Sequence, residues 1–107
     1  MLDLSLTYNL LKTLEKDPQL SQRDLARCLG VSLGKINFCL NALIEKGCLK
    51  ADNFRKSNNK IAYAYLVTPH GVEQKARLTV EFLQIKAKQY EQLRTEIAAL
   101  QLELEGK

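Results

Sequence analysis

The sequence is poor in cysteine, the residue that cross-links small folds through disulfides and binds structural metals. It has only three cysteines, Cys28, Cys39 and Cys48, an odd number without the paired C-x-x-C spacing of a structural zinc site. We expect them to be reduced and mostly buried, as small hydrophobic residues of a core. This pattern argues against a disulfide framework and against a bound metal.

Residues that carry enzyme chemistry are equally scarce. The single histidine, His70, has neither a second histidine nor paired carboxylates beside it, so metal binding and acid–base catalysis are not expected. The sequence contains no glycine-rich phosphate loop and no nucleophile elbow. We therefore expect no enzyme and no cofactor.

A secretory signal and a membrane span are not evident. The chain opens with Met1-Leu2-Asp3, without a basic run before an apolar stretch, and no apolar run approaches the ~20 residues that a span needs. Its 107 residues, 46% of them hydrophobic, suffice for one core in a single domain. We expect a cytoplasmic protein that does not bind membranes.

The basic charge is concentrated in the middle of the chain. The net charge is +4, and between residues 50 and 60 the bases Lys50, Arg55, Lys56 and Lys60 oppose only Asp52. After residue 90, acidic residues outnumber basic ones. A surface that binds a polyanion is therefore expected in the middle of the chain and not at its end.

Apolar residues at helical spacing predict short helices in the first half. The first has a stripe of leucines from Leu6 to Leu14 and ends at Asp17-Pro18, because proline disfavours helix in the residue before it. The second is expected to begin at the capping sequence Ser21-Gln22-Arg23-Asp24 and to stop at Gly30 after about ten residues.

The third helix follows at once, and the short connection predicts a motif. Ser32 is its expected N-cap, its apolar face runs from Ile36 to Ile44, and Gly47 ends it. Two short helices joined by so tight a turn form a helix-turn-helix, whose second helix can enter the major groove of DNA.

A β-hairpin is predicted next. Residues 48–52 can form a strand, Asn53 to Lys60 is polar and rich in turn formers, and Ile61 to Thr68 is rich in tyrosine and aliphatic residues. Such a hairpin with a basic tip is the wing of a winged helix. Tyr63 and Tyr65 alternate on its second strand, where packing is the expected role and stacking on single-stranded bases the alternative.

The final segment predicts one long helix. Thr68-Pro69-His70-Gly71 reads as an N-cap with proline in the first turn. Apolar residues then recur at heptad spacing, at Leu83, Tyr90, Leu93, Ile97, Leu100 and Leu104. Thr79 and Lys86 interrupt the seam earlier, so it is short for a free coiled coil. We expect the helix to pair with a second copy of the chain, in an orientation that the sequence leaves open.

Together these elements predict a mainly α (α+β) fold. Residues 1–68 form a winged helix-turn-helix that binds DNA, and residues 69–107 form a C-terminal helix for dimerisation. Two reading helices in a homodimer would match half-sites about one helical turn, ~34 Å, apart in a palindromic operator.

The outward face of the third helix carries the expected base contacts. Lys35 can donate to guanine or to phosphate, Asn37 and Asn41 can pair with adenine, and Phe38 can pack on a thymine methyl group. The alternative is a solvated helix face with Phe38 tucked against the hairpin.

Phosphate contacts are expected from helix starts and from the wing. The candidates are Ser21, Gln22, Arg23, Ser32, Arg55, Lys56 and Lys60. Capping alone also explains the two serines, and a solvated loop also explains the basic wing.

The helix-turn-helix resembles that of MarR-type regulators. The residues that carry this resemblance are Leu29-Gly30-Val31-Ser32, Ile36, Leu40, Leu43 and Glu45-Lys46-Gly47. The wing and its exit resemble more narrowly the small MarR-type regulators associated with exopolysaccharide gene clusters, through Asp52-Asn53-Phe54-Arg55, Ser57, Asn59-Lys60, Tyr63, Tyr65 and Leu66-Val67-Thr68-Pro69-His70-Gly71. The similarity continues through Lys75, Phe82-Leu83, Lys86 and Tyr90.

This resemblance implies a bacterial, dimeric transcriptional regulator, with polysaccharide genes as candidate targets. Two departures stand out. The chain begins almost directly at its first helix, so the ligand pocket of larger relatives is not transferred, and an effector stays unknown. Phe38 occupies a position where related helices often carry a polar or basic residue.

Two other functions compete with duplex DNA binding. In a protein-interaction adaptor, the winged domain would be a scaffold and the last helix would recruit a partner, but the basic wing would have no purpose. RNA binding is a third possibility, although exposed aromatic platforms are sparse.

Overall fold

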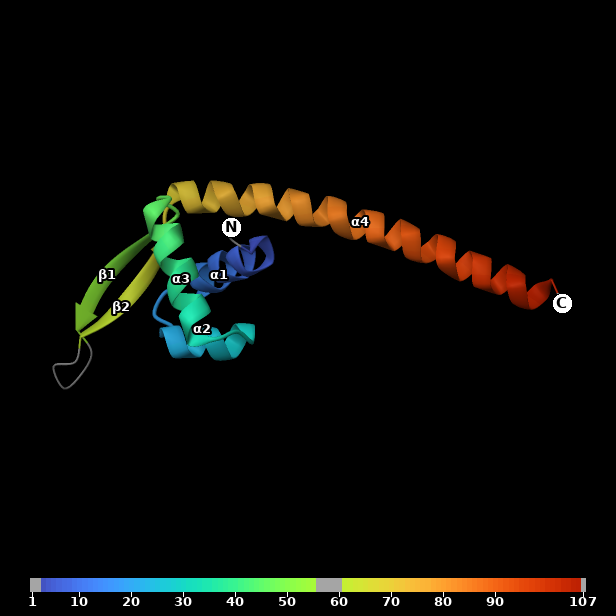
Figure 1. Cartoon of the computed structure of the whole chain (residues 1–107). Coiled ribbons are helices and arrows are strands. Elements are labelled where there is room, and N and C mark those ends of the chain that lie inside the picture. Colours follow the sequence, from blue (N-terminus) through green and yellow to red (C-terminus); the bar gives the residue numbers. More distant parts are fainter. Residues whose placement is uncertain (1–2, 56–60, 107) are drawn as a thin grey trace.

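The computed structural model describes residues 3–55 and 61–106. Along the chain the elements are α1 (Leu4–Lys16), α2 (Gln22–Leu29), α3 (Leu33–Glu45), β1 (Leu49–Arg55), β2 (Ile61–Val67) and α4 (Pro69–Glu105). The three short helices form a lobe with the β1–β2 hairpin beside it, and α4 crosses this lobe and extends far beyond it (Figure 1). This is the winged helix-turn-helix with a long C-terminal helix that the sequence predicts.

The predicted caps of the helix-turn-helix are confirmed. Ser21 and Asp24 form a reciprocal capping box at the start of α2, and Gly30 ends that helix in the left-handed conformation with φ of 68°. The hydroxyl of Ser32 then accepts a hydrogen bond of 3.1 Å from the backbone N–H of Lys35. These short-range interactions turn the chain from α2 into α3 within three residues.

The hairpin is longer than its sequence suggests. Leu49 pairs with Val67 and Arg55 with Ile61 in an antiparallel register, so residues 53–55, expected as part of a turn, are strand. Asn53 disfavours a strand, but the partner segment, rich in residues that favour strands, offers backbone hydrogen bonds along its whole length, and this pairing overrides the local preference. The prediction of a strand ending at Asp52 was therefore wrong by three residues.

The start of α4 is tightly fixed. Thr68 accepts a hydrogen bond of 3.0 Å from the N–H of Gly71, and its own hydroxyl donates to the carbonyl of Gly47 at 2.5 Å. Pro69 occupies the first turn, as predicted. The helix then runs without interruption for 37 residues.

Only the first half of α4 packs on the lobe. Leu78 is buried, Lys75 forms an ion pair with Glu15 of α1 at 2.5 Å, and the rings of Phe82 and Tyr8 meet edge to face with centroids 5.5 Å apart. From Leu83 onward every described residue of α4 is exposed. The distal half of the helix therefore leaves the lobe without a partner in this chain.

The core joins all three short helices to the root of the hairpin. It consists mainly of leucines, together with Ile36, Cys39, Cys48 and Tyr65. The expectation of mostly buried cysteines is right for Cys39 and Cys48, whereas Cys28 is exposed. Burial raises the pKa of the Cys39 and Cys48 thiols above the ordinary value, so both favour the neutral form.

Among residues 3–55 and 61–106 no single helix has the length and hydropathy of a membrane span. The pair α2 and α3 reaches that length and composition only across a bend of 110°.

Candidate nucleic-acid interface

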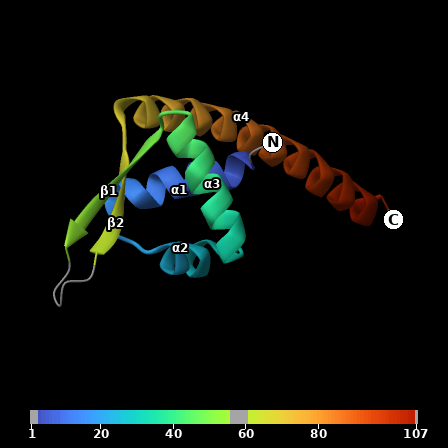
Figure 2. The ribbon, with the colours of Figure 1, turned by 60° about the vertical axis from the view of Figure 1, so that its left-hand side comes forward.

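The helix-turn-helix and the wing point to the same side of the molecule. In two views 60° apart, α2 and the far end of the hairpin lie on the side of the lobe opposite α4 (Figures 1 and 2). The N-terminal end of α3 lies beside α2, while its C-terminal end approaches α4. The fold therefore places the helix-turn-helix and the described end of the hairpin on one side and keeps the long helix away from them.

The two faces of α3 separate as the sequence predicts. Ile36, Cys39, Leu40 and Leu43 are buried in the core. The opposite face is exposed and carries Leu33, Gly34, Lys35, Asn37, Phe38 and Asn41. Packing of the inner face against α1 and α2 leaves the outer face available to a groove.

Phe38 stands in solvent on this face. Its side chain is 62% exposed, so the alternative in which it tucks against the hairpin is wrong. An aromatic ring that is this exposed in the middle of α3 has no packing role among the residues that the structure describes. The predicted contact of Phe38 with a thymine methyl group is compatible with this exposure and stays a prediction.

Lys35 and Asn37 lie on opposite flanks of α3. Two residues of helix separate side chains by about 160° around the axis. Accordingly, the Lys35 ammonium lies 3.7 Å from a carboxylate oxygen of Asp3 at the start of α1, whereas Asn37 faces α2. Gly34, Phe38 and Asn41 form the ridge between these two flanks.

A chain of side-chain hydrogen bonds crosses the reading face. Gln22 Nε2 donates to the Tyr65 hydroxyl at 3.0 Å, Asn37 Nδ2 donates to Gln22 Oε1 at 3.3 Å, and Asn41 Nδ2 donates to Asn37 Oδ1 at 3.1 Å. We call these four residues the amide chain. It links the hairpin to α2 and then to α3.

Sequence reasoning missed the amide chain. It treated Gln22 only as a phosphate contact, and it correctly gave Tyr65 a packing role, since that side chain is only 8% exposed. The one local signal was the spacing of Asn37 and Asn41, because side chains four residues apart on a helix are neighbours. The side chain of Tyr63 lies outside the described part of the structure.

The polar residues at the two helix starts keep the capacity to bind phosphate. The hydroxyls of Ser21 and Ser32 each accept a backbone N–H, which confirms their capping role. Each hydroxyl proton can still be donated, since a serine oxygen accepts and donates at once. Arg23 is exposed beside Ser21. Capping and phosphate binding are therefore compatible at these positions.

The wing candidates cannot be placed as precisely. Lys56 and Lys60 lie outside the described residues, and of Arg55 only the backbone, at the end of β1, is described. Their contact with DNA stays a prediction.

Comparison with known proteins agrees with this geometry. Residues 4–50 match the model of a winged helix-turn-helix DNA-binding family. Among solved structures, the adhesin competence repressor from Streptococcus pyogenes superposes with a TM-score of 0.63 at 15% identity, over 84% of this chain and 65% of that one. That repressor is described as a zinc-dependent MarR-family regulator.

Two further structures extend the comparison. The PcaV transcriptional regulator from Streptomyces coelicolor has a TM-score of 0.63 at 21% identity, over 96% of this chain and 80% of that one. A DNA complex of MepR from S. aureus has a TM-score of 0.63 at 16% identity, over 94% and 76%. This chain has the fold of the MarR-type regulators. No curated protein sequence matches it significantly, and the resemblance to exopolysaccharide-associated regulators stays a prediction.

In this MarR-type fold the distal half of α4 exposes an apolar seam. The six residues predicted for the dimer interface are all exposed, at 68% for Leu83, 61% for Tyr90, 54% for Leu93, 47% for Ile97, 60% for Leu100 and 83% for Leu104. The seam therefore stays in water unless another molecule covers it.

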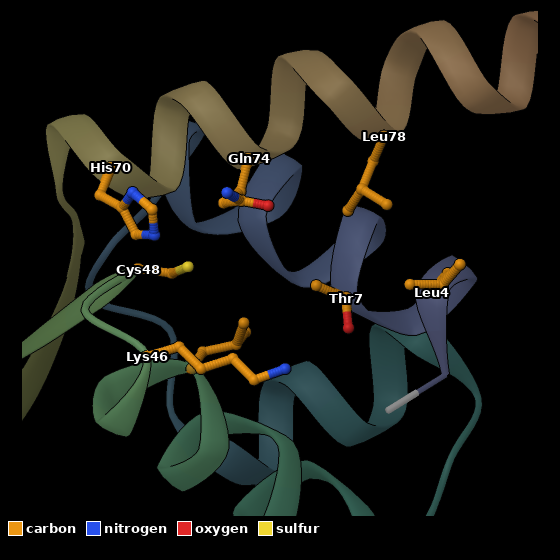
Figure 3. A pocket seen from close by; sticks show the side chains of 8 residues that line it. Leu4, Thr7, Lys46, Cys48, His70, Gln74 and Leu78 are labelled. Carbon is orange, nitrogen blue, oxygen red and sulfur yellow. The ribbon is translucent and has the colours of Figure 1, made fainter. Parts of the chain in front are cut away.

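A cavity of about 330 Å³ lies where α4 begins on the lobe (Figure 3). It is lined by Leu4, Thr7, Leu43, Lys46, Cys48, His70, Gln74 and Leu78. Apolar walls with the polar ends of Lys46, His70 and Gln74 around them suit a small organic molecule. Sequence reasoning did not find this cavity, because its lining spans residues 4 to 78.

Metal ligands do not cluster in this MarR-type fold. Within residues 3–55 and 61–106, no group of three or more histidine, cysteine, aspartate or glutamate side chains could hold a metal ion. Of these residue types, only His70 and Cys48 line the cavity.

Proposed function

We propose that this chain is a homodimeric, sequence-specific regulator of transcription that binds double-stranded DNA in the cytoplasm. The observation that carries the proposal is the exposed outer face of α3, whose amides and aromatic ring have no role in the core. The match of residues 4–50 to a DNA-binding family model supports it.

Base recognition falls to α3. Asn41 lies on the outward ridge and Asn37 on its flank, and an amide can accept from adenine N6 while donating to N7. Phe38 packs on a thymine methyl group. Lys35 lies on the other flank, where it reaches guanine or the phosphate backbone once it leaves Asp3. Each good base contact is worth about 1 to 3 kcal/mol of discrimination.

Phosphate binding falls to the residues around this face. They are Ser21, Gln22, Arg23 and Ser32 at the helix starts, and Arg55, Lys56 and Lys60 in the wing. Such contacts position the protein and make its affinity fall with salt.

Dimerisation falls to residues 69–107, and DNA reading to residues 1–68. Covering the seam of α4 recovers roughly 1.5 to 3 kcal/mol for each large side chain that becomes fully buried. A two-fold axis through paired helices presents two copies of α3 to a palindromic operator. The resemblance of the wing residues suggests exopolysaccharide genes as targets, which a genome-wide binding map would test.

A salt titration tests the DNA interface. Replacing Arg55, Lys56 and Lys60 by alanine is expected to weaken binding to all duplexes alike and to lower the log–log salt slope by about 0.9 for each lost phosphate contact. An unchanged slope would remove the wing from the interface.

Light scattering tests the dimer. Ile97→Asp and Leu100→Asp place a charge in the seam and should halve the mass measured at micromolar concentration. Leu102→Asp is the matched control, because Leu102 is 67% exposed and lies about 160° around the helix from Leu100. A monomeric wild type that binds one half-site as tightly as a palindrome would contradict the homodimer.

A further inference from the structure

The amide chain joins a buried anchor to the exposed reading face. Its first member, Tyr65, lies in the root of the hairpin and is 8% exposed, and its N–H also donates to the carbonyl of Pro18 at 2.9 Å. Its last member, Asn41, is exposed on the ridge of α3. The bond between Gln22 and Tyr65 spans 43 positions of sequence.

Hydrogen bonds of this kind orient each amide in turn. A carboxamide has its oxygen on one side and its NH₂ on the other, so fixing one group fixes the direction of the other. Gln22 turns its NH₂ toward Tyr65 and its oxygen toward Asn37. Asn37 then turns its own oxygen toward Asn41. In this arrangement the bonds run in one sense from the buried Tyr65 hydroxyl to the exposed Asn41, and each amide is held by its neighbour.

The outcome at Asn41 suits one base. One N–H of Asn41 is engaged by Asn37, which leaves the second N–H and Oδ1 without a partner among the residues that the structure describes. One donor beside one acceptor is the pair that adenine N7 and N6 require. Asn37 already uses one N–H on Gln22 and one lone pair of its oxygen on Asn41, so a base would have to share an oxygen that is already engaged, and Asn37 is less suited to bidentate reading than Asn41.

We propose that Tyr65 and Gln22 are positioning residues that set the base preference of Asn41 through Asn37. This inference rests on the proposed function. A side chain held in the orientation that it uses when bound loses less conformational freedom on binding, and the wrong base then meets an amide that cannot turn to suit it. Tyr65 thereby influences specificity from the interior of the domain, without touching DNA.

The test begins with duplexes that full-length wild-type protein enriches from a random pool. Affinities for the best duplex and all its single base-pair variants are then measured for wild type, Tyr65→Phe, Asn41→Ala and the double variant. At the base pair where Asn41→Ala abolishes the preference for one base, Tyr65→Phe is expected to reduce that preference two- to ten-fold. This magnitude corresponds to the usual contribution of one hydrogen bond. The double variant should lose no more than Asn41→Ala alone, and the salt slope should stay unchanged.

Matched variants separate positioning from stability. Tyr8→Phe removes a hydroxyl from the α1–α4 contact, away from the amide chain, and should leave base preference unchanged. Gln22→Glu keeps an acceptor for Asn37 and should preserve the pattern of preference at lower overall affinity, whereas Gln22→Met should lose the pattern as Tyr65→Phe does. If Tyr65→Phe folds poorly, the comparison of Gln22→Glu with Gln22→Met still tests the positioning role.

The possible failures are distinguishable. If the wild type enriches no sequence, the proposed function itself is wrong. If it does, but Tyr65→Phe and Gln22→Met leave the preference intact, weaken all duplexes equally, or add to the loss in Asn41→Ala, the positioning role is overturned.

Discussion

The close contact at Gly71 gives the sharpest test of how α4 is joined to the lobe. An added Cβ at this position would lie 2.2 Å from the carbonyl oxygen of Cys48 and 2.8 Å from Cγ1 of Val67. The oxygen cannot simply withdraw, because it accepts the N–H of Thr68 at 3.1 Å. Gly71→Ala must therefore shift the start of α4 or break this hydrogen bond.

The expected loss follows from these contacts. Overpacking costs about 1 to 3 kcal/mol, and a lost hydrogen bond about 1 kcal/mol. The gain in helix propensity offsets about 0.5 to 1 kcal/mol. We expect a net loss of about 1 to 3.5 kcal/mol in the free energy of unfolding. Gly34→Ala is the matched control, since a Cβ there meets nothing within 4 Å, and it should stabilise the protein by about 0.5 to 1 kcal/mol.

Thermal and urea unfolding measure both variants at one protein concentration, since the proposed dimerisation would add to stability in a concentration-dependent way. At about 4 to 8 °C per kcal/mol for a domain of this size, Gly71→Ala should melt roughly 4 to 28 °C below the wild type, while Gly34→Ala melts above it. Equal melting temperatures for Gly71→Ala and the wild type would refute the close approach of α4 to Cys48 and Val67 at the root of the hairpin.

Two further outcomes are expected. Ellman's reagent should titrate one thiol per native chain, that of Cys28, and three thiols after unfolding. The reason is that Cys39 and Cys48 are buried and their raised pKa disfavours the reactive thiolate. Rapid reaction of the folded Cys28→Ser variant would contradict this expectation. Thr68→Val loses both the cap on α4 and the hydrogen bond to the carbonyl of Gly47, and should cost about 1 to 2 kcal/mol in urea unfolding, with Thr68→Ser nearly unchanged.

Features that depend on neighbouring residues could be predicted from the sequence. Ser21, Ser32 and Thr68 cap their helices through bonds to residues three positions away, and Gly30 ends α2 through its own conformation. The apolar spacing of α3 likewise separates its buried and exposed faces. Such interactions are local, so residue type and spacing are sufficient to indicate them.

Features that join distant segments could not. The bond between Gln22 and Tyr65 depends on how the hairpin packs beside α2, and the ion pair of Lys35 depends on where α1 begins. The extension of β1 to Arg55 depends on its partner strand. In each case the side chain or backbone has several acceptable partners, and only the tertiary arrangement selects one.

The uninterrupted length of α4 has a mechanical consequence. Neither glycine nor proline occurs between Val72 and Glu105, so the helix has no built-in joint between the lobe and the seam. From Ile97 to Gly71 it spans about 39 Å at 1.5 Å per residue. If two copies pair through the seam, a change of about 10° in their crossing angle shifts the two lobes roughly 7 Å relative to each other, close to two base-pair steps. In the proposed dimer the long helix would act as a stiff lever arm, so that small adjustments where two chains cross become large changes in the spacing of the DNA sites that they can occupy together.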